Sequence, residues 1–341
     1  MITKAAVLIK KNNIRVVKLK IPKLKIGQVL VKVLYSSICH TQVQEIMGLR
    51  GKDKYLPHCL GHEATAKVIS VGPKVTKFKK GQKVCLTWIP SSGLKGSKTE
   101  YLSMNNKIIN TGPVSTFSKY AIVSENRILK LPKKCNLKRD VLMGCAIPTA
   151  FNAVFNTLKH STKENIIIFG SGGLGLACIY AAKYAGFKKI YAADIISSKL
   201  KVALRFGATN IIQLKKNNFN QIMKPYNNYF NAAIECTGNL NVIKNSLSTI
   251  RNFGGQLIVI GNYPFFKNIK VDPWNFVMGK VIKGAWQNEV SYNNKFNKFY
   301  KKLSKFKWKK FFGSKVYKLD QISLALNDLK KGKVIRPLIK M

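Results

Sequence analysis

Apolar residues along the chain follow two different patterns, and the change between them falls near residue 145. Before it, short runs rich in β-branched residues are separated by glycine and proline turns; the runs are Val29–Tyr35, Ala64–Val71 and Lys83–Trp88. Runs of this kind, bounded by turn residues, predict a compact domain rich in β-strands.

After residue 145, apolar runs of strand length alternate with segments of helical length. The expected strands are Ile166–Phe169, Ile190–Asp194, Ala232–Cys236, Leu257–Ile260 and Val281–Gly284. The expected helices are Leu174–Ala185, a segment capped by Ser197 that ends at Gly207, and Leu240–Phe253. This alternation predicts an α/β domain in which a parallel sheet carries helices on both faces. From about residue 287 to Met341 the pattern is helical and then extended, which is compatible with a return to the first domain.

Composition agrees with two domains and sets the compartment. The 341 residues are 46% apolar, more than one ordinary core needs. Seven scattered cysteines without a CxxC pair predict reduced thiols, and therefore a cytoplasmic protein. The longest apolar stretch, Ile166–Phe187, is interrupted by five glycines and by Lys183, so we expect no membrane span.

The net charge of +47, from 60 basic and 13 acidic residues, raises the question of a nucleic-acid partner. The lysines, however, are spread along the chain without a base-reading module, and arginine, the better phosphate and guanine ligand, is scarce. A drift of composition toward Lys, Asn and Ile, as in an AT-rich genome, is the simpler account. We expect no specific nucleic acid as partner.

One lysine-rich segment, Lys295–Lys310, is open to two interpretations. Its aromatic residues recur at helical spacing, and its lysines fall on another face. A helix lying on an anionic surface has this pattern. So does a core-packed helix with a solvated lysine face, which is the interpretation that we favour.

A glycine-rich turn follows the first strand of the second domain and opens a helix; it consists of Gly170, Ser171, Gly172, Gly173, Leu174 and Gly175. In a dinucleotide-binding turn, Gly170 allows the tight bend, Gly172 lets a pyrophosphate approach the backbone, and Gly175 lets helix and strand pack closely. Asp194, at the end of the next strand, can bind the adenosine ribose and would repel a 2′-phosphate, which favours NAD. A glycine-rich turn without a ligand is the alternative.

Three dispersed residues, Cys39, His62 and Cys145, have the chemistry of metal ligands. Two thiolates and one imidazole suit zinc, and three protein ligands leave one tetrahedral position for water or substrate, as in catalytic zinc sites. Taken singly, each cysteine could equally be a buried, inert thiol.

The chain resembles the zinc-dependent alcohol dehydrogenases of the medium-chain dehydrogenase/reductase superfamily. The resemblance rests on Cys39-His40-Thr41, Leu60-Gly61-His62-Glu63, the segment Gly72–Gly81, Gly144-Cys145 with Thr149, the glycine turn, and Ile335-Arg336. It implies a GroES-like catalytic domain formed by residues 1–145 and 287–341, and a Rossmann NAD-binding domain with a doubly wound parallel sheet, formed by residues 146–286.

The resemblance also implies roles at the metal. A catalytic zinc held by Cys39, His62 and Cys145 acts as a Lewis acid on the substrate oxygen. Thr41 accepts the proton of the alcohol, and Glu63 tunes the metal or ligates it transiently.

For NAD, the resemblance implies four further contacts. Thr149 orients the nicotinamide, His40 and Arg336 touch the pyrophosphate, and Lys199 lies by the adenosine ribose.

Three departures from the family pattern stand in the sequence. Gln44 replaces the histidine that often ends the proton relay, so the proton must leave by water or another group. Gln42 replaces an acidic residue that commonly orients the zinc-bound histidine; it can still form a hydrogen bond but carries no charge. No cysteine occurs between Cys85 and Cys135, so the structural-zinc loop is missing, Pro90–Gly112 must be ordered by other contacts, and we expect one zinc per chain.

Three functions remain open at this point. The first, which the metal ligands favour, is an NAD(H)-linked zinc dehydrogenase acting on a small-molecule alcohol, aldehyde or sugar-like hydroxyl. The others are a metal-independent reductase of the same fold and a basic protein that binds nucleic acid or a membrane surface. The sequence does not identify the substrate. We expect a homo-oligomer, a dimer or tetramer, because such sheets commonly pair across an edge strand.

Overall fold

The computed structural model describes the chain except for residues 160–162, 216, 287–291 and 304. It divides into two compact units, the first formed by Met1–Cys145, Asn288–Lys302 and Trp308–Met341, the second by Ala146–Gln287 and Leu303–Lys307. The grouping of Leu303–Lys307 differs from the expected boundary. Its cause is Phe306, whose ring packs edge-on against Tyr180 and Phe206 of the second unit.

The first unit is built mainly of strands. Five of them close a barrel: β1 (Ile2–Lys10), β2 (Asn13–Lys20), β7 (Thr99–Ser103), β8 (Ile108–Thr111) and β4 (His58–Cys59). A sheet follows the order β10 (Ile128–Lys130), β6 (Lys83–Leu86), β5 (Ala64–Val71), β3 (Gln28–Ser37), β18 (Leu338–Lys340) and β17 (Val316–Lys318), and β9 (Tyr120–Ser124) also pairs with β3. The expected strands of this half are β3, β5 and β6.

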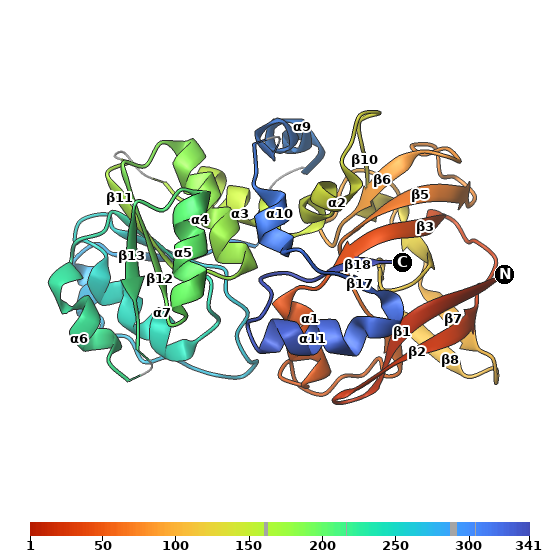
Figure 1. Ribbon diagram of the computed structural model, residues 1–341, viewed down its shortest axis with the longest axis horizontal. Coiled ribbons are helices and arrows are strands. Elements are labelled where there is room, and N and C mark those ends of the chain that lie inside the picture. The colour runs from red at the N-terminus through yellow and green to blue at the C-terminus, as the bar shows by residue number, and fades with distance from the viewer. Residues whose placement is uncertain (160–162, 216, 287–291, 304) are drawn as a thin grey trace. The chain divides into compact units, whose positions relative to one another are not determined.

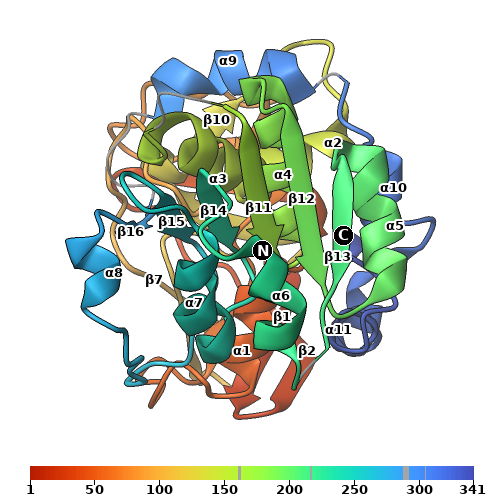
Figure 2. The same cartoon turned by 90° about the vertical axis from the view of Figure 1, so that its left-hand side faces the viewer.

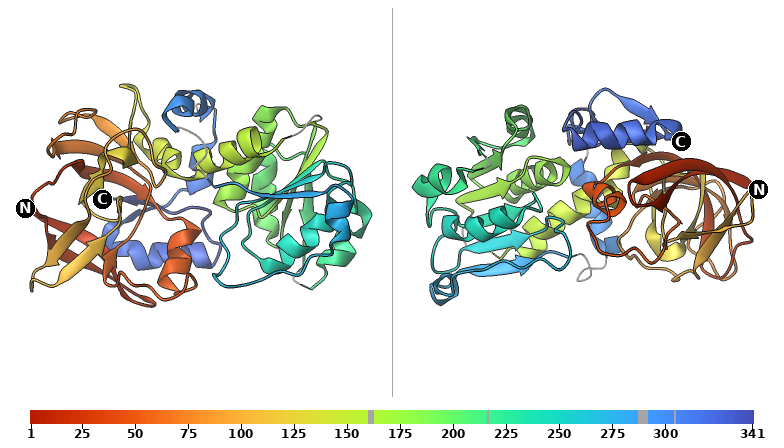
Figure 3. Two further views of the ribbon diagram at one scale, coloured as in Figure 1. Left: turned by 180° about the vertical axis from the view of Figure 1, so that it is seen from behind. Right: turned by 90° about the horizontal axis from the view of Figure 1, so that it is seen from below.

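Helices α1 (His40–Ile46) and α11 (Ile322–Lys330) lie side by side in the first unit (Figures 1 and 3). Their apolar faces share one core, to which Val43 and Ile46 contribute from α1, and Ile322 and Leu326 from α11. The core therefore anchors α1, and with it Cys39 directly before the helix, to the C-terminal part of the chain.

The second unit contains a six-stranded parallel sheet in the order β13 (Asn210–Gln213), β12 (Lys189–Asp194), β11 (Asn165–Phe169), β14 (Ala232–Glu235), β15 (Gln256–Val259) and β16 (Val281–Gly284), as Figure 2 shows. Helices α4 (Gly173–Ala185) and α5 (Ser197–Phe206) cover one face, and α6 (Phe219–Met223) and α7 (Leu240–Ser246) cover the other (Figures 1 and 2). Ile166 to Phe169 are completely buried, as expected for a strand covered on both faces.

The order of these strands creates a switch point. From β11 the chain continues outward to β12 and β13, and then returns to β14 on the other side of β11. Ligands of doubly wound sheets bind outside the carboxyl ends of the strands at such a point. Here that point lies between β11 and β14.

Two expectations about helix ends were wrong. Ser197 is the first residue of α5 and not its cap; Ile196 occupies the cap position, and its N–H donates to Asp194 Oδ1 at 2.9 Å. The helix expected to reach Phe253 ends at Ser246, followed by a 3₁₀ turn to Thr249, because Ile250 forms a bridge to Phe230.

The lysine-rich segment forms two helices, α9 (Tyr292–Leu303) and α10 (Trp308–Phe312), where one continuous pattern was expected. Its apolar residues Phe296, Phe299, Leu303 and Phe306 are buried, whereas Lys298, Lys305 and Lys309 are exposed. This is the core-packed arrangement. The side chain of Lys295 lies outside the described residues.

None of the helices in the described part of the chain combines the length and apolar character needed to cross a bilayer.

Candidate metal centre

Cys39, His62 and Cys145 come from three separate segments of the first unit. Cys39 lies between β3 and α1, His62 in the turn between β4 and β5, and Cys145 after a helical turn at residues 141–144. The turn before His62 needs glycine, since Gly61 has a φ of +91° and a Cβ there would lie 2.4 Å from Thr116 Oγ1.

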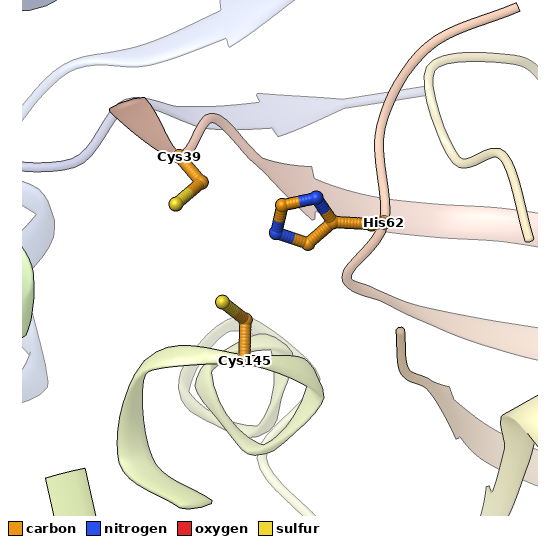
Figure 4. A group of neighbouring side chains, drawn as sticks. All are labelled: Cys39, His62 and Cys145. Carbon is orange, nitrogen blue, oxygen red and sulfur yellow. The ribbon is translucent and has the colours of Figure 1, made fainter. Parts of the chain in front are cut away.

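The potential ligand atoms of the three residues all lie within 4.8 Å of one another. Figure 4 shows the two sulfur atoms and one ring nitrogen of His62 turned toward a common space. Gln42 Nε2 lies 2.7 Å from His62 Nδ1, so Gln42 makes the contact expected from its position. His62 Nε2 is buried and has no hydrogen-bond partner in the part of the chain that the structure describes.

The pKa values of the two thiols are shifted in opposite directions. A hydrogen bond from Cys145 holds the pKa of Cys39 well below its usual range, and the positive charges of Arg336 and His62 act in the same direction. The same hydrogen bond, together with burial, raises the pKa of Cys145. A divalent cation can take the place of thiol protons and also bind His62 Nε2, which has no hydrogen-bond partner among the described residues, so the donor set fits zinc.

Glu63, beside His62, is not part of this group of ligand atoms. Its carboxylate is fully buried: Oε1 accepts hydrogen bonds from Ser37 Oγ at 2.5 Å, from Arg336 Nε at 2.9 Å and from a terminal nitrogen of Arg336. Its other oxygen, Oε2, has no partner within the described residues. Burial raises the pKa of Glu63, and Arg336 opposes this effect.

Arg336 therefore lies buried against Glu63 and Ser37, 3.2 Å from the hydroxyl of Ser37. The family resemblance implies that Arg336 touches a pyrophosphate, and no sequence pattern points to Ser37. No local pattern joins residues 63 and 336. Thr41, by contrast, lies where its spacing suggests, with its Oγ1 3.5 Å from Cys39 Sγ.

In the second unit, the glycine turn has the geometry of a ligand-binding loop. Gly170 has a φ of +92°, and a Cβ on Gly175 would lie 1.7 Å from the carbonyl oxygen of Gly170. A Cβ on Gly172 would meet no atom within 4 Å, so the space beside this residue is open. The hydroxyl of Ser171 is buried without a partner among the described residues and was not singled out from the sequence.

Asp194 ends β12 beside this turn. Its Oδ2 accepts the N–H of Ser171 at 2.7 Å and its Oδ1 that of Ile196. The remaining lone pairs of the carboxylate can accept hydrogen bonds from a ribose.

The other residues predicted to bind coenzyme are distributed over both units. His40 is exposed at the start of α1 in the first unit, whereas Thr149 in α3 (Ala146–Asn152) and Lys199 in α5 are half-buried in the second. Gly173 and Leu174 form the first turn of α4.

Residues 90–112 are ordered without cysteine ligands. The N–H of Leu94 donates to Glu125 Oε2 at 2.7 Å and that of Gly96 to Ser124 Oγ at 2.6 Å, and the segment continues into the β7–β8 hairpin.

Two sequence families match the chain: the alcohol dehydrogenase GroES-like domain over residues 25–133 and the zinc-binding dehydrogenase over residues 173–305. S-(hydroxymethyl)glutathione dehydrogenase of Photobacterium damsela subsp. piscicida is 30% identical, over 80% of this chain and 81% of that protein. Alcohol dehydrogenase class-3 of Caenorhabditis elegans is 29% identical, over 92% of this chain and 90% of the relative.

Solved structures agree. Benzyl alcohol dehydrogenase from Acinetobacter calcoaceticus has a TM-score of 0.86 at 26% identity, covering 100% of this chain and 99% of that one. An alcohol dehydrogenase zinc-binding domain protein from Burkholderia ambifaria, at 24% identity, shares the fold with a TM-score of 0.89, covering 100% and 99%. The chain belongs to the zinc-dependent alcohol dehydrogenases of the medium-chain dehydrogenase/reductase superfamily.

Proposed function

We propose that this chain is a zinc-dependent dehydrogenase that moves hydride between an alcohol or sugar-like hydroxyl and NAD, with Cys39, His62 and Cys145 as its zinc ligands. The observation that carries the proposal is the meeting of two thiols with an imidazole nitrogen that lacks any other partner in the described residues. Membership of the family supports the reaction class, oxidation of a CH–OH group or its reverse.

The chain's own residues divide the work at the centre. Zinc, when bound, supplies Lewis acidity for the substrate oxygen. Thr41 accepts the proton of the alcohol, from a hydroxyl that lies close to Cys39. Gln42 contacts the ring of His62, and Glu63 would tune a bound zinc, or ligate it transiently, through Oε2, which has no partner among the described residues. Because Gln44 cannot act as a base, the proton leaves Thr41 by water or another group.

NAD is the second cofactor. The open space at Gly172 and the start of α4 suit its pyrophosphate, and Asp194 suits its adenosine ribose. The contacts that family resemblance adds are those of His40 and Arg336 with the pyrophosphate, Thr149 with the nicotinamide and Lys199 with the ribose. Arg336 already donates hydrogen bonds to Glu63 and Ser37. A phosphate would therefore contact the guanidinium N–H groups that do not take part in these bonds.

We assign catalysis to residues 1–145 and 287–341 and coenzyme binding to residues 146–286. We also propose a single zinc per chain. Hydrogen bonds to Glu125 and Ser124, and the β7–β8 hairpin, order the segment that corresponds to the structural-zinc loop of the family pattern. A metal content of one ion per chain tests this directly.

The substrate is a small-molecule alcohol or its carbonyl product. The names of the relatives point to two starting compounds, S-(hydroxymethyl)glutathione and benzyl alcohol. Polyols extend the panel, because the chain's polar site chemistry does not distinguish a sugar-like hydroxyl from a simple alcohol.

For assembly, we propose a homodimer that pairs through β16, at one end of the six-stranded sheet. An edge strand offers unpaired backbone groups, and the large apolar side chains of Trp274, Val277 and Trp286 are exposed near it. Val277→Lys should lower the mass measured by light scattering to that of a monomer. Ile211→Lys, at the opposite edge strand β13, is the matched control. A tetramer or an unaffected mass would contradict this arrangement.

None of the seven cysteines is in a disulfide, and a zinc site with two of them requires reduced sulfur. We therefore propose a reducing compartment, the cytoplasm.

The decisive experiment measures zinc per chain together with NAD reduction over the alcohol and polyol panel, in the wild type, in Cys39→Ala and in Cys135→Ala. Cys135 is a half-buried thiol outside the ligand cluster and controls for loss of any cysteine. We expect Cys39→Ala to lose zinc and turnover and Cys135→Ala to keep both. Full turnover of Cys39→Ala, or activity that survives chelation, would establish the metal-independent reductase instead.

A further inference from the structure

A carboxylate in the second unit joins the turns that follow two neighbouring strands. Glu235, the last residue of β14, is completely buried. Its Oε1 accepts the N–H of Thr237 at 2.6 Å and the hydroxyl of Thr237. Its Oε2 accepts the hydroxyl of Tyr263 and, at 3.4 Å, the N–H of Gly238. Tyr263 belongs to the turn after β15, so one side chain holds both turns.

The two turns also touch through their backbones. A Cβ on Gly238 would lie 2.1 Å from the carbonyl oxygen of Asn262, and a Cβ on Gly261 would lie 2.4 Å from Glu235 Oε2. The N–H groups of Ile260 and Gly261 donate to the carbonyl of Glu235, each at 3.0 Å. Because these backbone contacts are so close, the two turns can adopt only one arrangement relative to each other.

The contacts of Glu235 with Thr237, Gly238 and Tyr263, here called the clamp, extend to the next helix. The hydroxyl of Thr237 accepts the N–H of Asn239 at 3.0 Å, and the side chain of Asn239 caps α7. Glu235 thus sets the path of the chain from the end of β14 to the start of α7.

The position of these turns connects the clamp with coenzyme binding. They lie at the carboxyl ends of β14 and β15, across the switch point from β12, which carries Asp194. A dinucleotide with its adenosine ribose at Asp194 and its pyrophosphate on the glycine turn extends its other half toward β14 and β15.

Burial raises the pKa of Glu235, and the hydrogen bonds from Thr237 and Tyr263 oppose this rise by favouring the carboxylate. Removing the Tyr263 hydroxyl leaves a buried carboxylate oxygen whose one remaining contact among the described residues is the long one to Gly238. The turns must then shift to restore a donor.

Building on the proposed function, we propose that Glu235 and Tyr263 are positioning residues for the nicotinamide half of NAD, acting through the turns at residues 236–239 and 260–263. They need not touch the coenzyme. Their effect is to hold the backbone that receives it.

The test separates the two halves of the coenzyme by calorimetry on zinc-loaded protein. For Tyr263→Phe we expect the Kd for NAD to rise by about tenfold, the loss of one hydrogen bond to a charged group, while the Kd for AMP changes by less than about twofold. The KM for NAD should rise together with the Kd for NAD, and the KM for the alcohol should remain unchanged. Glu235→Gln should act in the same direction, and more strongly.

Tyr229→Phe is the matched control. It removes a tyrosine hydroxyl that lies before β14, at the amino ends of the strands, where it contacts the hydroxyl of Tyr191 at 3.2 Å. This variant should bind NAD and AMP as the wild type does.

Wild-type affinity for NAD in Tyr263→Phe would overturn the proposal, and so would an equal weakening of NAD and AMP, which indicates general loosening of the unit. If Glu235→Gln fails to fold, Tyr263→Phe, which removes a single oxygen, decides. A wild-type protein that binds no NAD would refute the proposed function itself, so the two failures are distinguishable.

Discussion

Gln42 uses both ends of its amide at the metal centre, and we expect this arrangement to limit the affinity for zinc. Its Oε1 accepts the N–H of Cys39 at 3.0 Å, and its Nε2 faces His62 Nδ1. A ring that binds a cation through Nε2 carries its proton on Nδ1 and needs an acceptor there, which the amide can offer only by giving up Cys39.

Gln42→Glu removes that conflict, since two carboxylate oxygens accept from Cys39 and His62 at once. We expect the affinity for zinc to rise by about tenfold or more, measured by competition with a chelator of known affinity. Gln44→Glu adds the same charge two residues further on and should have a smaller effect. Equal gains in the two variants would show that charge alone, and not the contact with His62, is responsible.

Arg336 and Glu63 form a buried ion pair that is costly to break from one side. Arg336→Gln leaves the Glu63 carboxylate without its cation, and we expect the free energy of unfolding to fall by about 3 to 5 kcal/mol. Urea denaturation of the zinc-free protein measures this loss. The double variant Glu63→Gln/Arg336→Gln should recover much of it, because the uncompensated charge is gone; a double variant as unstable as Arg336→Gln would contradict the explanation.

At the scale of elements, the β11–α4 turn contains two glycines with opposite constraints. Gly175→Ala drives a Cβ into the carbonyl of Gly170, so we expect a loss of several degrees in Tm together with loss of NAD binding. Gly172→Ala meets no protein atom and should keep the wild-type Tm while weakening NAD, because its methyl group occupies the space proposed for the pyrophosphate. A Gly172→Ala variant with wild-type NAD affinity would place the pyrophosphate elsewhere.

Helix α11 is tied to β17 by Asp328, whose Oδ2 accepts the Tyr317 hydroxyl at 2.8 Å and Lys315 Nζ at 3.2 Å. The Tyr317 hydroxyl, helped by Lys315, lowers the pKa of Asp328. A carboxyl whose folded pKa lies below its unfolded value, about 3.9, stabilises the fold above that pH and loses the contribution as pH falls through the folded pKa.

Asp328→Asn should therefore be less stable than the wild type near pH 6, and the difference should shrink as the pH drops below about 4. Urea unfolding of both proteins in the presence of a chelator keeps the metal ligands out of the comparison. A difference that stays constant from pH 6 to pH 3 would mean that Asp328 acts by packing and not by charge.

The elements that the sequence predicted best are short β-type runs that are bounded by a turn residue next to them in the sequence. Ala64–Val71 and Val281–Gly284 have the expected bounds, because their apolar runs end at glycine on at least one side. The start of α5 and the end of α7 were missed because they depend on partners elsewhere: Asp194 holds the N–H of Ile196, which becomes the cap residue in place of Ser197, and Phe230 pulls Ile250 out of the helix.

The same distinction holds for the site. Cys39, Thr41 and Gln42 lie within four residues, so their spacing carries information about their contacts. The pairing of Arg336 with Glu63 spans 273 positions and follows only from the return of the chain into the first unit. The contact of Glu235 with Tyr263 could not be predicted from the sequence for the same reason, because it depends on two separate turns that meet only in the fold.

At the scale of the whole molecule, the dominant property is an excess of positive charge that the fold does not neutralise. With 60 basic and 13 acidic side chains, most lysines have no acid to pair with, and their mutual repulsion opposes the compact state. The lysines in and between α9 and α10 illustrate this, since their apolar neighbours are buried while Lys298, Lys305 and Lys309 face solvent.

Salt should therefore stabilise this protein. Raising NaCl from 0.01 M to 0.15 M shortens the screening length from about 30 Å to about 8 Å and suppresses repulsion between exposed lysines. We expect Tm to rise by about 2 °C or more over this range, measured by calorimetry with chloride as the anion, because sulfate would strengthen apolar burial as well. Sucrose at equal osmolarity controls for solute effects. A Tm that is flat or falls with NaCl would show that the surface ion pairs, such as Lys188 with Glu164, outweigh the repulsion of the excess lysines.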